Sequence, residues 1–111
     1  RSCPGIRKFY ALVRPKKGQT PHERMSEVLK SKLYDKLRET IPDLNDRVVP
    51  VCGDILEPRL GLSAEDEAMV AADTNVVFHS AATVKFDEEL KLSVQMNVLG
   101  VRRIIELARK M

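Results

Sequence analysis

The sequence predicts an α/β protein built around a partial doubly wound parallel sheet. Short apolar segments without polar alternation recur along the 111 residues, as is typical of strands buried on both faces. Helical patterns with an apolar face separate these segments. The resulting order of strand, helix, strand, helix, strand, helix favours parallel strands joined by right-handed crossovers.

The six predicted elements alternate between strand and helix along residues 9–13, 20–39, 48–52, 63–73, 75–79 and 87–111. The strands are the apolar runs Phe-Tyr-Ala-Leu-Val, Val-Val-Pro-Val-Cys and Asn-Val-Val-Phe-His. Pro50 fits the second strand best at a sheet edge or a strand start, because proline cannot donate to the ladder. The pattern therefore indicates a Rossmann-like sheet.

Local residues support each predicted helix. Thr20, Pro21 and Glu23 form a capping-box pattern at the start of the first helix. Ser63 suits the N-cap of the second, and the third carries a long apolar stripe interrupted by Gly100. The opening residues 1–5 are typical of a helix end, so we expect residues 1–111 to be one incomplete dinucleotide-binding domain.

Charge and cysteine content exclude several classes of protein. Nineteen Lys and Arg against sixteen Asp and Glu give a net charge of only +3, so nucleic-acid binding is not implied. Cys3 and Cys52 stand far apart without metal-ligand spacing, which favours a reduced, intracellular protein without a metal site. No apolar run is long enough to cross a membrane, so we expect any membrane association to come from regions outside this segment.

Ligands of open parallel sheets bind beyond the carboxyl ends of the strands, where Arg14 and Asp54 lie in this sequence. Arg14, with Lys16 and Lys17 beside it, suits a ribose 2′-phosphate, and the alternative is a solvated basic loop. The Asp54 carboxylate can accept from an adenine amino group, although Gly-Asp after a strand is also common turn chemistry.

The third strand is followed by Ser80, Ala81 and Ala82, whose small side chains allow close approach of a ribose or pyrophosphate, or simply tight packing. We interpret His79 as a core residue of a buried strand rather than a catalytic base. Asn97 places an amide among apolar helix residues. It either bonds locally or faces solvent, or it fixes a water or backbone group near an active site.

Four motifs taken in order resemble the fatty acyl-CoA reductases, a family of the extended short-chain dehydrogenase superfamily. They are Leu-Val-Arg-Pro-Lys-Lys-Gly (12–18), Gly-Asp-Ile (53–55), Val-Val-Phe-His-Ser-Ala-Ala-Thr-Val-Lys-Phe (76–86) and Asn-Val-Leu-Gly (97–100). The resemblance covers essentially the whole chain. It implies NADPH-dependent reduction of a long-chain acyl-CoA to a primary fatty alcohol, with Asn97 matching the asparagine of the superfamily's catalytic tetrad.

The same resemblance assigns the cofactor contacts. Arg14 would hold the 2′-phosphate of NADPH, and Asp54 and Ile55 would flank its adenine. Ala81 and Ala82 would contact the ribose on the nicotinamide side. The family's enzymes associate with membranes of the peroxisome or endoplasmic reticulum, so the resemblance implies that location. It implies nothing about oligomeric state.

Two motifs of the family are expected outside this segment. They are the G-x-x-G-x-x-G turn after the first strand, before Arg1, and the catalytic Y-x-x-x-K pair, beyond Met111. We therefore expect the isolated segment neither to bind NADPH tightly nor to turn over substrate. The alternatives are another extended short-chain dehydrogenase, such as a carboxylic acid reductase or an epimerase, and a non-catalytic NADP-binding pseudoenzyme.

Overall fold

A computed structural model describes residues 2–111 as two compact units, the first ending at Cys52 and the second spanning Gly53–Met111. Arg1, where the expected helix end would begin, lies outside the described residues. Pro4 and Gly5 lie in a turn closed by the Ile6 amide, which donates to the Cys3 carbonyl at 3.2 Å.

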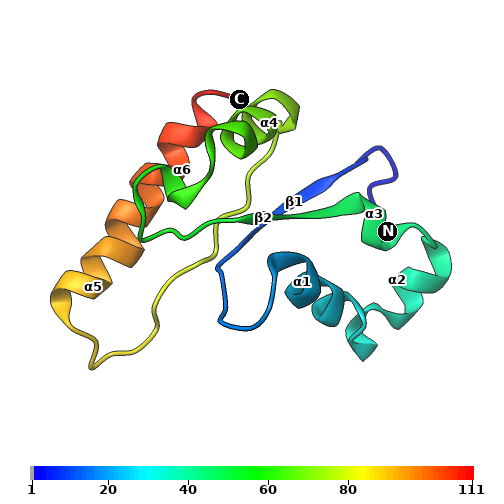
Figure 1. The fold of residues 1–111 in the computed structure, drawn as a ribbon, viewed down its shortest axis with the longest axis horizontal. Coiled ribbons are helices and arrows are strands. Elements are labelled where there is room, and N and C mark those ends of the chain that lie inside the picture. Colours follow the sequence, from blue (N-terminus) through cyan, green and yellow to red (C-terminus); the bar gives the residue numbers. More distant parts are fainter. Residues whose placement is uncertain (1) are drawn as a thin grey trace. The chain divides into compact units, whose positions relative to one another are not determined.

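The first unit contains the predicted parallel pair of strands. β1 (Phe9–Val13) pairs with β2 (Val48–Cys52) in a register that runs from Phe9 opposite Val48 to Val13 opposite Cys52 (Figure 1). Pro50 lies opposite Ala11. Its missing amide is tolerated because β2 has a hydrogen-bonded neighbour on one side only in the described sheet.

The helical part of the first unit differs from the prediction. α1 (Pro21–Leu29) begins with the expected capping box, in which the Glu23 amide donates to Thr20 Oγ1 at 3.2 Å. The predicted continuation to residue 39 is wrong. Shorter helices follow α1 instead: the 3₁₀ helix η1 (Lys32–Tyr34), α2 (Asp35–Thr40) and α3 (Leu44–Arg47).

A tertiary contact explains the break after α1. Ser31 has an extended backbone, with φ −63° and ψ 155°. The Arg38 guanidinium donates to the Leu29 carbonyl and, at 3.1 Å, to the Ser31 carbonyl. These bonds satisfy carbonyls that a continuing helix would otherwise have used. Leu29, Leu44 and Val51 are the buried apolar residues of this unit.

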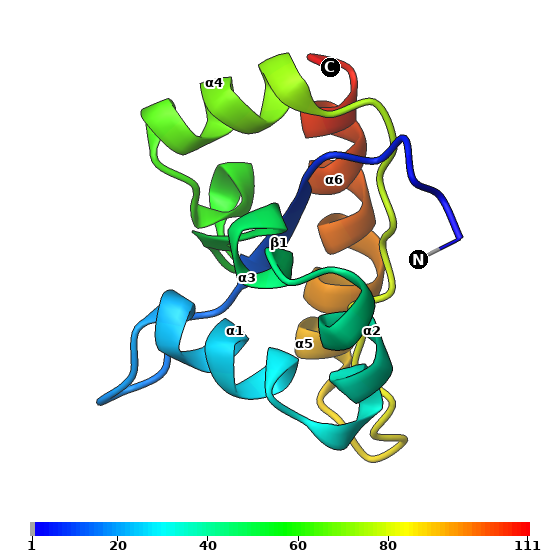
Figure 2. The ribbon, with the colours of Figure 1, turned by 90° about the vertical axis from the view of Figure 1, so that its right-hand side faces the viewer.

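The second unit is mainly helical. Its elements in order are η2 (Pro58–Gly61), α4 (Ala64–Asp73), α5 (Leu90–Val94), the π-helical segment η3 (Gln95–Leu99) and α6 (Gly100–Ala108). α4 begins after Ser63 as predicted, and the final helix begins three residues later than predicted. Figure 2 shows α4 lying against the last turns of α6. No helix within residues 2–111 is long and apolar enough to cross a membrane.

The third predicted strand, over residues 75–79, is not formed. These residues run as coil, with Val76 and Phe78 exposed by 68% and 91%. A strand requires a neighbour to satisfy its backbone groups. In the doubly wound order 3-2-1-4-5-6, this segment pairs with the strand that precedes β1, and no such strand lies within the described residues.

Candidate cofactor-binding site

Arg14 follows β1 directly, as expected from the sequence. Its side chain is exposed, and no partner for its guanidinium occurs within residues 2–111. Its carbonyl accepts a hydrogen bond from the guanidinium of Arg24 on α1. The backbone of Arg14 is therefore held in place, while its guanidinium makes no hydrogen bond or ion pair within the described residues. Sequence reasoning missed Arg24, although the capping box beside it fixes its place in the first turns of the helix.

The basic loop after Arg14 is a tight turn. The Gln19 amide donates to the Lys16 carbonyl at 3.1 Å, and Gly18 has a φ of 79°, which favours glycine. The turn thus keeps Lys16 and Lys17 exposed close to Arg14 in the chain.

Asp54 closes a compact turn two residues after β2. Its Oδ1 accepts from the Leu56 amide at 2.9 Å, and its own amide donates to the Leu60 carbonyl at 2.8 Å. Within the described residues, no hydrogen bond reaches its other carboxylate oxygen. Asp54 therefore combines the turn chemistry of one interpretation with the free acceptor that the adenine interpretation requires.

Ile55 is held by α6 on two sides. Its carbonyl accepts from Arg103 Nη1 at 2.7 Å. Its side chain is buried and faces Gly100, where an added Cβ would lie 3.6 Å from Ile55 Cβ. This is ordinary van der Waals distance, so Gly100 gives close packing without being sterically required.

Asn97 lies on η3, and both the oxygen and the nitrogen of its side-chain amide bind the backbone of Thr83. Its Oδ1 accepts from the Thr83 amide at 3.0 Å, and its Nδ2 donates to the Thr83 carbonyl at 3.2 Å. The Thr83 hydroxyl lies 3.4 Å from a Glu88 carboxylate oxygen. Asn97 therefore holds the backbone of the segment that follows Ala82. Interruptions of this π-helical kind often occur at functional sites.

The residues before Thr83 form an exposed coil. The Ala81 and Ala82 side chains are exposed, so a ligand could approach the backbone closely there. His79 is half-buried in the same coil, so it is not the core residue of a buried strand that the sequence predicted. Asp54, Ile55, Ala82 and Asn97 all belong to the second unit.

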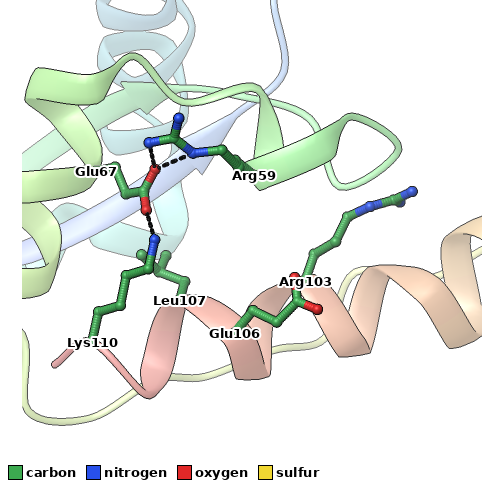
Figure 3. A pocket seen from close by; sticks show the side chains of 6 residues that line it. All are labelled: Arg59, Glu67, Arg103, Glu106, Leu107 and Lys110. Atoms are coloured by element: carbon green, nitrogen blue, oxygen red, sulfur yellow. Dashed lines mark hydrogen bonds and ion pairs between the residues drawn. The ribbon is translucent and has the colours of Figure 1, made fainter.

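A buried glutamate was missed by sequence reasoning. Glu67 on α4 is only 6% exposed, and Arg59 Nε donates to its Oε2 at 2.8 Å. The Lys110 ammonium binds the other oxygen, Oε1 (Figure 3). These hydrogen bonds, the one from Lys110 first, hold the pKa of Glu67 below its usual range. Because Lys110 lies 43 residues away, no local pattern reveals the pair.

A small cavity of about 50 Å³ adjoins this ion pair. It is lined by Arg59, Glu67, Arg103, Glu106, Leu107 and Lys110. A cavity of this size is too small to hold a nucleotide.

Each unit presents a charged side chain with the chemistry to bind part of a nucleotide. The free Arg14 guanidinium suits a phosphate, and the free oxygen of Asp54 suits an amino group. Within the described residues no three His, Cys, Asp or Glu side chains gather as metal ligands.

Comparison with known proteins agrees with this architecture. Residues 1–111 match the NAD-binding family described as "Male sterility protein". The chain is 47% identical to fatty acyl-CoA reductase 1 of Mus musculus over all 111 residues and 46% identical to that of Homo sapiens. It is 38% identical to fatty acyl-CoA reductase 2 of Mus musculus. It spans 22% of the length of each of these relatives.

A solved structure is also similar. The terminal R domain from the myxalamid PKS-NRPS biosynthetic pathway superposes with a TM-score of 0.71 at 33% identity. The match covers 91% of this chain and 24% of that one. With the parallel strands and the match over its whole length, the chain belongs to the male sterility protein family of NAD-binding proteins.

Proposed function

We propose that this chain is the dinucleotide-binding part of an NADPH-dependent reductase that converts long-chain fatty acyl-CoA to a primary fatty alcohol. The observation that carries the proposal is 47% identity to a fatty acyl-CoA reductase over every residue of the chain. The residues at the ends of β1 and β2 support it. Residues 1–111 would form one incomplete domain of the complete enzyme. Its location at a peroxisomal or endoplasmic reticulum membrane is part of the same proposal.

Arg14 would select NADPH over NADH. Its exposed guanidinium has no partner within residues 2–111, so binding a 2′-phosphate would break no existing ion pair. The bond from Arg24 to the Arg14 carbonyl would fix the chain from which that guanidinium extends. An arginine fork matches phosphate oxygens better than a single ammonium does.

Asp54 and Ile55 would hold the adenine. The free oxygen of Asp54 would accept from the adenine amino group, while Ile55, whose side chain is buried against Gly100 and whose carbonyl is bound by Arg103, would flank the ring with its backbone. Asn97 would act from the nicotinamide side by holding Thr83, so that Ala81 and Ala82 keep an open backbone for the ribose. NADPH, when bound, would supply a hydride to the thioester carbon, which releases the CoA thiol and leaves an aldehyde, and a second NADPH would supply the hydride that reduces the aldehyde to the alcohol.

Cofactor preference tests the role of Arg14 in the full-length protein. We expect Arg14→Gln to weaken NADPH binding about tenfold or more, since a hydrogen bond to a charged group contributes about 1.5–3 kcal/mol. NADH, which lacks the 2′-phosphate, should bind the variant and the wild type equally. Fluorescence titration measures both affinities.

Lys32→Gln is the matched control, because it removes one exposed positive charge from η1 without touching the basic loop. Equal losses for NADPH and NADH in Arg14→Gln would contradict the assignment. So would an equal loss of NADPH affinity in Lys32→Gln.

A further inference from the structure

The turn η2 has an unusual backbone. Arg59 and Leu60 have φ values of 53° and 61°, and Gly61 follows with 62°. Left-handed backbone is unfavourable for residues other than glycine, and it persists only where surrounding contacts hold it. Two consecutive non-glycine residues in this conformation therefore require strong support.

Two contacts supply that support. The Leu60 side chain is 1% exposed and anchors the turn in the core of the unit. The Arg59 guanidinium is bound by the buried carboxylate of Glu67, whose other oxygen is bound by Lys110 (Figure 3). One carboxylate thus joins the turn, α4 and the end of the chain after α6.

The same turn fixes the backbone of Asp54. The Leu60 carbonyl accepts from the Asp54 amide at 2.8 Å, and the Glu57 amide donates to the Asp54 carbonyl at 3.0 Å. A Cβ built on Gly61 would lie 3.4 Å from the Asp54 nitrogen, so the turn packs directly against it. A change in the backbone of Leu60 would therefore displace Asp54.

We propose that Glu67 is a positioning residue for cofactor binding: by holding Arg59 in its left-handed conformation, it fixes the turn that orients Asp54 toward the adenine. This rests on the adenine-binding role of Asp54 given above. Glu67 itself does not touch the cofactor. Its effect passes through Arg59 and the Leu60 carbonyl to the Asp54 amide.

Glu106 provides a matched control. It lines the same cavity, but its carboxylate bonds Arg102 one turn earlier on the same helix, at 3.0 Å from Arg102 Nε. Its side chain is 56% exposed. Glu106→Gln removes the same charge from the same cavity without touching η2.

The test is cofactor binding and steady-state kinetics of the full-length protein. If Glu67→Gln releases the turn so that the competent conformation falls to between about a third and a tenth of the population, the apparent affinity for NADPH falls about three- to tenfold. The kcat at saturating NADPH should stay unchanged, and Glu106→Gln should match the wild type in both. An unchanged NADPH affinity in Glu67→Gln would overturn the proposal.

Rescue by glycine separates positioning from general stability. Glycine adopts the left-handed conformation without an ion pair, so Arg59→Gly should make Glu67 dispensable. We expect Arg59→Gly/Glu67→Gln to bind NADPH as tightly as Arg59→Gly alone. A double variant that binds NADPH more weakly than Arg59→Gly overturns the proposal. The comparison of these two variants tests the proposal even if Glu67→Gln alone does not fold. A wild-type protein that binds neither NADPH nor NADH would instead overturn the proposed function.

Discussion

Several side chains of the second unit act on the backbone of other segments. Asn97 binds the backbone amide and carbonyl of Thr83, and Arg103 donates to the Ile55 carbonyl. Such bonds determine where loop atoms lie, which matters for a ligand that approaches the backbone closely. Side chains of this kind are difficult to recognise in a sequence, because their partners lie 14 and 48 residues away.

The pH dependence of stability tests the Glu67 ion pairs. Because Lys110 and Arg59 lower the pKa of Glu67 in the folded state, the unfolded state takes up its proton at higher pH. The stabilisation is therefore fully present above the usual glutamate pKa of about 4.3 and is lost as pH falls through the lower folded-state value.

We expect the free energy of unfolding of the wild type to exceed that of Glu67→Gln by a margin that is greatest near neutral pH and shrinks below about pH 4. Urea unfolding at a series of pH values measures this margin. A margin that stays constant with pH would contradict the assigned ion pairs.

Substitution of Gly100 tests whether close packing or helix propensity determines stability at this position. An added Cβ would meet Ile55 at 3.6 Å without a clash, so Gly100→Ala should stabilise the protein by about 0.5–1 kcal/mol through its helix propensity. Gly18→Ala is the contrasting variant. Its φ of 79° disfavours alanine although nothing lies within 4 Å, so it should destabilise the protein. Thermal unfolding of both variants measures the difference, and a destabilising Gly100→Ala would show that the packing is tighter than described.

At the scale of elements, the helix caps could be predicted from the sequence, but the early end of α1 and the missing third strand could not. Thr20 and Ser63 cap α1 and α4 where the sequence places them, because the cap bonds span only three residues. The break at Ser31 depends on Arg38, and the strand expected over residues 75–79 depends on a neighbouring strand. Neither partner can be read from the local sequence.

The link between Asn97 and Thr83 makes a prediction about the coil before α5. Asn97→Ala removes the acceptor of the Thr83 amide, so we expect faster hydrogen exchange at Thr83 and its neighbours. The loss of stability should be about 0.5–1.5 kcal/mol, the usual net value of a hydrogen bond. Gln95→Ala, also on η3, is the control. If both variants exchange at the same rate at Thr83, Asn97 does not hold this coil.

At the scale of the whole molecule, the parallel strand order predicts two residues of the candidate site. Arg14 and Asp54 were chosen from strand ends alone, and within the described residues the Arg14 guanidinium and one Asp54 carboxylate oxygen have no hydrogen-bond partner. The contribution of Glu67 depends on contacts with Arg59 and Lys110, which no motif encodes. Local sequence therefore predicts exposed charged groups at strand ends more readily than the long-range contacts that hold a turn in place.

The most direct test is turnover by the full-length protein with NADPH and a long-chain acyl-CoA. We expect consumption of NADPH that requires the thioester, with a primary fatty alcohol of the same chain length as the product. NADH should support a much slower reaction. Absence of acyl-CoA-dependent NADPH oxidation by the folded, full-length protein would contradict the proposed reductase function.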